Sequence, residues 1–133
     1  MATGYLENNE PFIDLQIRGM VPSPAPTKLL IDTGFTGFLS IPLVKALPLG
    51  LVLVSTTSVV LADGSTVFRL LCLATVNIDG QQQAGTVILE PTGSSALLGM
   101  DFLRRFNLQL NVQPNSGLVE LVPVPLPPTP PTP

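Results

Sequence analysis

The chain has 133 residues, which suffices for one domain with a buried core and leaves no room for a second folded unit. It is 45% hydrophobic but only 11% charged, so we expect apolar surface to be buried in an obligate oligomer. The net charge of -3, with six Lys and Arg residues scattered along the sequence, argues against a nucleic-acid partner, which normally meets a basic patch.

Histidine is absent from the sequence, and Cys72 is its single cysteine. This excludes Ser-His and Cys-His catalytic pairs, so acid and base chemistry falls to carboxylates and we expect no metal or cofactor. Cys72 lies in an apolar run, which indicates a buried, inert thiol, and a lone cysteine favours a reducing, cytoplasmic location. The first ten residues lack signal-peptide features and no segment suits a membrane span, so we expect no membrane partner.

Strands are predicted from the beginning of the domain. Residues 12–18 alternate between polar and apolar side chains, which indicates a half-buried strand, and residues 28–32 form a second strand after a proline-rich connection. A short strand is expected at 38–41. One helical turn at 43–47, closed by Pro48, follows it.

Further along, Asp-Gly pairs separate runs of β-branched and apolar residues. The segments 57–61 and 66–73 flank Ala62-Asp63-Gly64-Ser65, and 75–78 and 84–89 flank Asp79-Gly80. Each arrangement predicts a β-hairpin, because Asp-Gly suits the tight turns that join antiparallel strands.

The C-terminal part carries the one convincing helix, predicted at 98–106 with Phe102 and Phe106 four residues apart and basic residues in its last turn. A final hairpin is expected from 108–112 and 118–122. Residues 123–133 are rich in proline and predict a polyproline or disordered tail.

The most informative motif is Asp32-Thr33-Gly34, which directly follows the apolar run Leu29-Leu30-Ile31 and occurs once. Taken alone, the tripeptide is consistent with an ordinary turn, because Asp and Gly are favoured there. Its position at the end of a hydrophobic strand also suits the acid of an aspartic peptidase, a chemistry that needs two carboxylates.

Together with Leu97-Leu98-Gly99 ahead of a helix, this motif resembles the retropepsin-like aspartic peptidases, in particular their stand-alone prokaryotic members. The resemblance covers residues 12–122, after an N-terminal segment at 1–11. It implies a mainly β, closed barrel-like fold with a single lobe, the acid protease fold, and one short C-terminal helix. It also implies a homodimer that hydrolyses peptides with a water activated by Asp32 from each chain.

The same resemblance implies roles for other residues. Thr33 and Gly34 would support the active site, the former by donating its hydroxyl across the dimer axis. Ala62, Asp63 and Gly64 would belong to a flap that closes over a peptide, although an ordinary surface hairpin explains them too. Leu30 and Leu97 could line side-chain pockets, but core packing is an equally good explanation.

The chain departs from the family pattern at Phe35, where a small residue is usual. Thr36 and Met100 stand where retroviral relatives place an acidic residue and an arginine, and we expect apolar packing in place of that ion pair. Two other functions stay open: a non-catalytic dimerisation or peptide-binding module with the same fold, and a small barrel with a ligand in its mouth.

Overall fold

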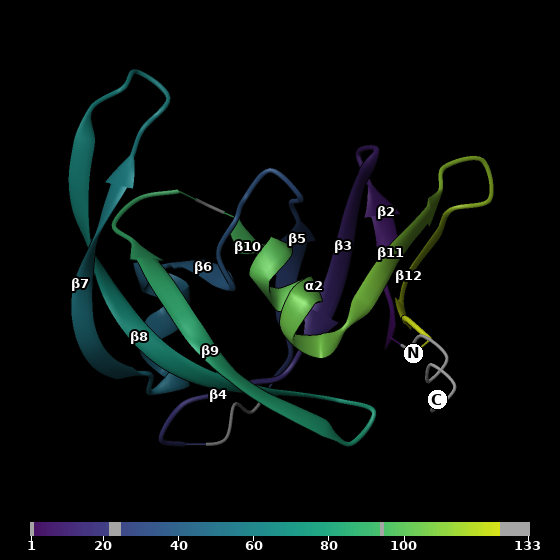
Figure 1. The fold of residues 1–133 in the computed structure, drawn as a ribbon, viewed down its shortest axis with the longest axis horizontal. Coiled ribbons are helices and arrows are strands. Elements are labelled where there is room, and N and C mark those ends of the chain that lie inside the picture. The colour runs from purple at the N-terminus through teal and green to yellow at the C-terminus, as the bar shows by residue number, and fades with distance from the viewer. Residues whose placement is uncertain (1, 22–24, 94, 126–133) are drawn as a thin grey trace, which may run out of the picture.

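The computed structural model describes residues 2–21, 25–93 and 95–125. Strands make up 57% of the structure and helices 12%, so the fold is mainly β, as the sequence predicts. The strands form a large sheet and a small sheet, and Figure 1 shows the short C-terminal helix near the middle of the molecule, where it contacts strands of both sheets. The tail residues 126–133, and part of the proline-rich connection before residue 27, lie outside the described residues.

The large sheet has nine strands. In spatial order it contains β2 (Tyr5–Glu7), β3 (Glu10–Leu15), β5 (Thr27–Ile31), β10 (Ala96–Leu98), β6 (Leu39–Pro42), β9 (Gln81–Glu90), β8 (Thr66–Ile78) and β4 (Ile17–Arg18), with β7 (Val52–Val60) also paired to β8. Among the described strands this order runs from β2 to β4 without returning to its start. The closed barrel therefore stays a prediction.

The small sheet contains β1 (Ala2–Thr3), β12 (Leu118–Pro123) and β11 (Leu108–Gln113) in that order. Three helical segments complete the fold: α1 (Leu43–Ala46), the 3-10 helix η1 (Leu47–Leu49) and α2 (Met100–Phe106). The turn predicted at 43–47 is thus shared between α1 and η1, because Pro48 lacks the N–H that would continue an α-helix.

The hairpins predicted around Asp-Gly pairs are present as β7–β8 and β8–β9. The expected helix begins at Met100 instead of residue 98, because residues 96–98 form strand β10. This strand lies between β5 and β6, parallel to the former and antiparallel to the latter. Two strands that are consecutive in the sequence are therefore separated by one that comes much later.

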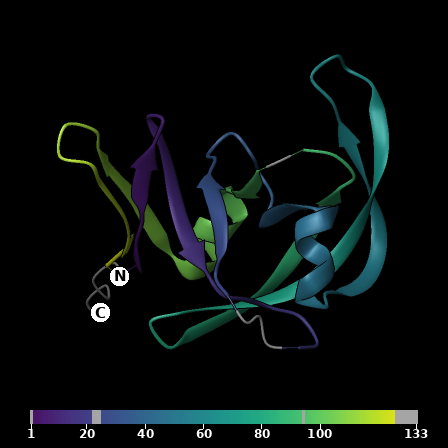
Figure 2. The same ribbon diagram turned by 180° about the vertical axis from the view of Figure 1, so that it is seen from behind.

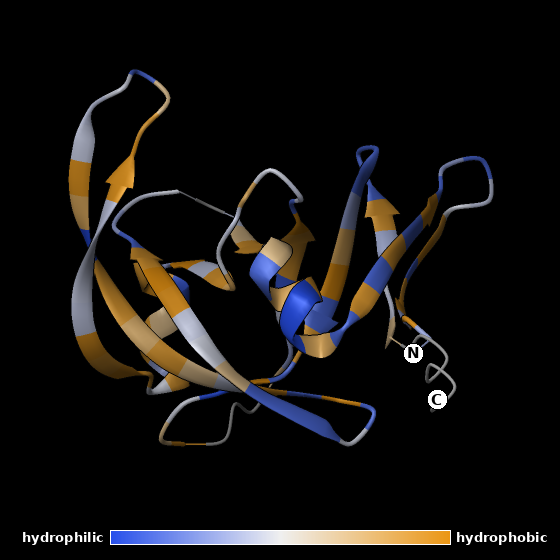
Figure 3. Ribbon diagram, viewed as in Figure 1, coloured by the Kyte–Doolittle hydropathy of each residue, from blue (hydrophilic) through white to orange (hydrophobic). Residues whose placement is uncertain are grey.

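A cluster of three phenylalanine side chains packs α2 against the large sheet. The rings of Phe38 and Phe102 are 5.0 Å apart, and those of Phe102 and Phe106 are 4.7 Å apart. All three side chains are buried, as is Cys72, whose burial the sequence predicts. The hairpin turns between β2 and β3, between β8 and β9, and between β11 and β12 are hydrophilic (Figure 3). Apolar residues of the strands, such as Ile13, Val76 and Val119, are buried in the core.

Candidate active site

Asp32 is the first residue after β5 and begins the loop that leads to β6. Leu29 and Ile31 of β5 are buried, whereas the Asp32 side chain is half-buried at the end of the strand. The backbone N–H of Asp32 donates to the carbonyl oxygen of Leu98 at 2.9 Å, which continues the β5–β10 pairing by one residue. The hydrogen-bonded end of β5 therefore fixes the backbone position from which the Asp32 carboxylate projects.

The turn after Asp32 orients its carboxylate. The backbone N–H of Gly34 donates to Asp32 Oδ1 at 2.9 Å, and the N–H of Phe35 donates to the Asp32 carbonyl oxygen at 3.1 Å. A Cβ atom at Gly34 would lie 3.2 Å from Oδ1, so a side chain there would crowd the acid. Thr33 and Gly34 are exposed, and both are open to contact from outside the chain.

The beginning of α2 holds the other half of the loop. The N–H of Met100 donates to the Phe35 carbonyl at 2.8 Å, and the N–H of Asp101 donates to the Gly37 carbonyl at 3.1 Å. A Cβ atom at Gly99 would collide with the Gly37 carbonyl and lie 2.6 Å from the Phe35 ring. Only glycine fits this junction, so the structure brings together the two motifs that the sequence singles out.

The ring of Phe35 explains one departure from the family pattern. It packs over Gly37 and Gly99, where a Cβ atom at Gly37 would lie 2.6 Å from the ring. Thr36 and Met100 are both exposed, so apolar packing between these two positions stays a prediction. Leu30 and Leu97 are register partners on the adjacent strands β5 and β10, and both are half-buried.

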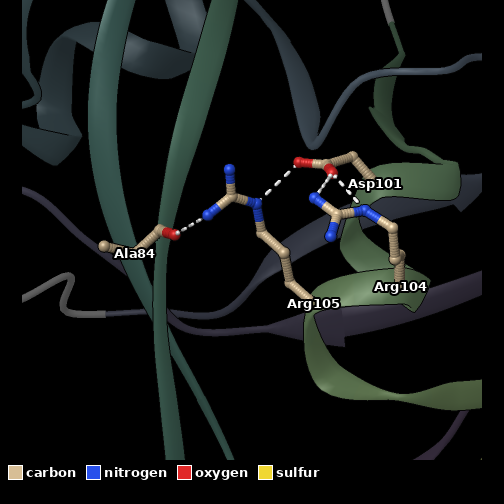
Figure 4. Close-up of polar contacts among 4 residues, drawn as sticks. All are labelled: Ala84, Asp101, Arg104 and Arg105. Atoms are coloured by element: carbon tan, nitrogen blue, oxygen red, sulfur yellow. Dashed lines mark hydrogen bonds and ion pairs between the residues drawn. The ribbon is translucent and has the colours of Figure 1, made fainter.

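An ion-pair cluster on α2 was missed by the sequence reasoning. Asp101 accepts hydrogen bonds from Arg104 at 2.6 Å and from Arg105 at 2.7 Å, and Arg105 also donates to the Ala84 carbonyl of β9 at 3.2 Å (Figure 4). Burial acts to raise the pKa of Asp101, but the hydrogen bonds from the two arginines outweigh it and lower the pKa. The sequence could have indicated these ion pairs, because Arg104 and Arg105 follow Asp101 by three and four residues, and side chains at these spacings are neighbours on a helix.

Two hollows lie beside the Asp32 loop. One of about 370 Å³ is lined by Asp32, Thr33, Leu30, Leu110 and Glu10, among others. A groove of about 420 Å³ continues from Thr33 between α2 and β11, along Met100, Leu103 and Leu110. Glu10 is exposed, and no hydrogen bond between the described residues joins it to Asp32.

The tip of the β7–β8 hairpin holds the three candidate flap residues, all of them exposed. Asp63 Oδ1 accepts hydrogen bonds from the N–H and the hydroxyl of Ser65, at 2.9 and 2.6 Å, and these bonds lower the pKa of Asp63. The hairpin and the Asp32 loop extend toward the same side of the molecule in Figures 1 and 2. Within the described chain, no hydrogen bond joins the tip to Asp32.

Comparison with known proteins gives a fold and no closer relationship. No protein-family model and no curated protein sequence matches the chain. Among solved structures, EIAV protease complexed with the inhibitor HBY-793 matches with a TM-score of 0.58 and 17% identity, over 81% of this chain and 98% of that one. A retropepsin-like aspartic protease from Rickettsia conorii matches with a TM-score of 0.51 and 16% identity, over 88% and 86% of the two chains.

The chain therefore has a retropepsin-like fold, as the sequence motifs predict. At identities of 16% and 17%, the similarity shows the fold alone. No helix within the described residues is long and apolar enough to cross a membrane.

Proposed function

We propose that the protein is an aspartic endopeptidase whose active site is formed by two Asp32 carboxylates, one from each chain of a homodimer. The observation that carries this proposal is the placement of Asp32 in a retropepsin-like fold, with its Oδ1 oriented by the Gly34 N–H at 2.9 Å. Its loop is fixed by β10 and by the first residues of α2. A carboxylate that is held in one orientation beside an open hollow fits a catalytic role better than it fits an ordinary surface turn.

Two chains are required because the chemistry needs two carboxylates. Asp32 is the single Asp of this sequence that is followed by Thr or Ser and then Gly, so one chain supplies half of a site. Carboxylates about 3 Å apart cannot both ionise, and the pair holds one proton between them. The exposed Thr33 and the apolar composition are consistent with a partner chain at this place.

The reaction follows from this shared proton. A water molecule between the carboxylates loses a proton to the ionised Asp32 as it attacks the scissile carbonyl carbon. The protonated Asp32 of the other chain donates to the carbonyl oxygen and stabilises the developing charge. The proton gained by the first carboxylate then passes to the amine nitrogen as the C–N bond breaks, while one hydroxyl of the tetrahedral intermediate returns its proton to the other Asp32. No covalent bond to the enzyme forms.

The remaining expectations form part of the same proposal. Thr33 binds across the dimer axis, Gly34 leaves room for the substrate backbone, and the hairpin tip at 62–64 closes over the peptide. Leu30 and Leu97 contact apolar substrate side chains. The peptidase domain extends over residues 12–122 with the strands closing into a barrel, and the reduced Cys72 suits the cytoplasm.

The direct test is cleavage of a mixed peptide library between about pH 4 and 7, the range in which a carboxylate pair shares its proton. Wild type is compared with Asp32→Asn and with Glu10→Gln, the latter because Glu10 lines the same hollow. We expect Asp32→Asn to abolish cleavage and Glu10→Gln to retain it. Equal cleavage by wild type and Asp32→Asn would refute the peptidase, and absence of cleavage in all three would leave the peptide-binding module.

A further inference from the structure

Glu10, the first residue of β3, lies where two hollows meet. One is the hollow of about 370 Å³ that Asp32 lines, and the other is a pocket of about 250 Å³ lined by residues of β2, β3, β5 and β10. The Glu10 side chain is exposed and lines both. A peptide held beside Asp32 would therefore meet a further carboxylate that the catalytic pair does not use.

The pairing of β3 with β5 explains this position. The two strands are antiparallel, and their last register partners toward the Asp32 loop are Phe12 and Leu30. Continuing this register by two residues brings Glu10 opposite Asp32. The pairing between the described strands stops before that point, and the hollow of about 370 Å³ lies where they part. Since residues two apart on a strand share a face, Glu10 lies on the same face of β3 as Phe12.

The neighbouring acidic side chains already have partners. Asp14 of β3 accepts a hydrogen bond from the Tyr5 hydroxyl at 2.7 Å, and Glu7 of β2 binds the Lys28 ammonium at 2.7 Å. Lys28 also lies 4.4 Å from the centre of the Phe12 ring. The positive charge of Lys28 is therefore committed to contacts within the chain.

Glu10 differs from these acids. Within the described part of the chain, no hydrogen bond or ion pair involves its side chain. Lys45 of α1 also lines the pocket of about 250 Å³, but it already has an interaction. A carboxylate without a counter-ion attracts a cation, and the attraction grows when a ligand displaces water from the site. Glu10 is thus an available anion beside the candidate catalytic acid.

The surroundings of Glu10 suit a long basic side chain. Leu30 and Leu110 line the Asp32 hollow together with Glu10. The aliphatic part of Lys or Arg can lie along such apolar side chains while its charged end reaches a carboxylate. The net charge of -3 on the chain also favours the approach of basic peptides over acidic ones.

We propose that Glu10 is a specificity-determining residue that selects peptide substrates with Lys or Arg close to the scissile bond. This inference rests on the proposed function and names the substrate class of the same site. In a symmetric dimer each chain contributes one Glu10, so basic residues are favoured on both sides of the scissile bond. Glu10 acts on the choice of peptide, so its neutralisation changes which members of a mixed library are cleaved.

Matched peptides test this selection on the full-length chain. The peptides share one apolar sequence, in which each position in turn carries Lys, Gln or Glu. The kcat/KM values of wild type are compared with those of Glu10→Gln, Glu10→Lys and Asp14→Asn. Asp14→Asn is the matched control, because it removes the same charge from the same face of β3, while Asp14 lines neither hollow.

We expect wild type to prefer Lys over Glu peptides by about 3-fold to 5-fold at the most sensitive position, as for an exposed ion pair. The preference should fade in about 1 M salt, which screens exposed charges. Glu10→Gln should remove it, Glu10→Lys should reverse it, and Asp14→Asn should keep it. An unchanged preference in Glu10→Gln, or equal losses in Glu10→Gln and Asp14→Asn, overturns this inference and leaves the peptidase proposal intact.

Binding decides the inference if wild type cleaves none of the peptides. Fluorescently labelled Lys and Glu peptides are then titrated with wild type and with Glu10→Gln. Tighter binding of the Lys peptide to wild type, lost in Glu10→Gln, supports the role of Glu10 while the proposed function fails. Equal binding of both peptides to wild type, or no binding at all, overturns the inference as well.

Discussion

The backbone N–H of Asp32 donates to the carbonyl oxygen of Leu98 at 2.9 Å, and this bond joins the two segments that define the candidate active site. The next residue after Leu98 is Gly99, where the chain turns from β10 into α2. Any displacement of this junction would therefore move the loop that carries Asp32.

The first prediction concerns Gly99→Ala. The new methyl group would collide with the Gly37 carbonyl and the Phe35 ring, which belong to the loop itself. We expect a loss of about 3 kcal/mol in the free energy of unfolding, as for other overpacked core positions, and a fall in kcat. Denaturant unfolding measures the first and peptide cleavage the second. Met100→Ala, at a half-exposed side chain, serves as the control and should change stability by under about 1 kcal/mol.

The second prediction concerns the acid sensitivity of Asp101. Its pKa in the folded state is lowered, so the ionised form stabilises the fold above about pH 4, and this contribution is lost as the pH falls through the lowered pKa. Asp101→Asn should reduce the free energy of unfolding by about 1–2 kcal/mol at pH 7. The difference from wild type should shrink toward about pH 2, where wild type is protonated too.

Urea unfolding of both proteins at a series of pH values measures this difference. Glu10→Gln provides a control carboxylate that is exposed and lies outside α2. If the difference between wild type and Asp101→Asn stays constant across the acid range, the ion pairs with Arg104 and Arg105 contribute nothing to stability.

The third prediction tests the flap with two matched glycines. Gly64 has a φ of 85° at the tip of β7–β8, and Gly80 has a φ of 82° at the tip of β8–β9, with no atom within 4 Å of a Cβ in either case. Gly64→Ala and Gly80→Ala should each cost about 1 kcal/mol of stability, because both force alanine into the left-handed region. Only Gly64→Ala should also change KM or kcat, by roughly 3-fold to 10-fold. Equal kinetics in the two variants would assign the β7–β8 tip to an ordinary surface hairpin.

Local chemistry made much of this fold predictable. Asp79 and Gly80 both have positive φ, at 51° and 82°, which is the geometry that an Asp-Gly turn between two strands implies. The alternation in residues 12–18 likewise predicted a strand, although the structure divides it into β3 and β4 at Gln16. These features depend on residues close in the sequence.

The arrangement around Asp32 depends on distant residues and was harder to predict. The helix was predicted to begin at residue 98, and only the pairing of residues 96–98 with β5 and β6 makes that residue part of a strand. Asp101 looked like an unremarkable helix residue, because its contact through Arg105 with the Ala84 carbonyl requires β9 to lie beside α2. The motif resemblance singled out these two segments, whereas their contact and the hydrogen bonds between them came from the structure.

The central claim is that each active site uses Asp32 from two chains, and a mixing experiment tests it most directly. Wild type and Asp32→Asn are combined in equal amounts, equilibrated until subunits exchange, and assayed for peptide cleavage at a fixed total concentration. If both carboxylates are needed, only wild-type pairs are active, and the mixture should retain about a quarter of the activity of undiluted wild type. Retention of about half would mean that each chain works alone, and would contradict the shared site.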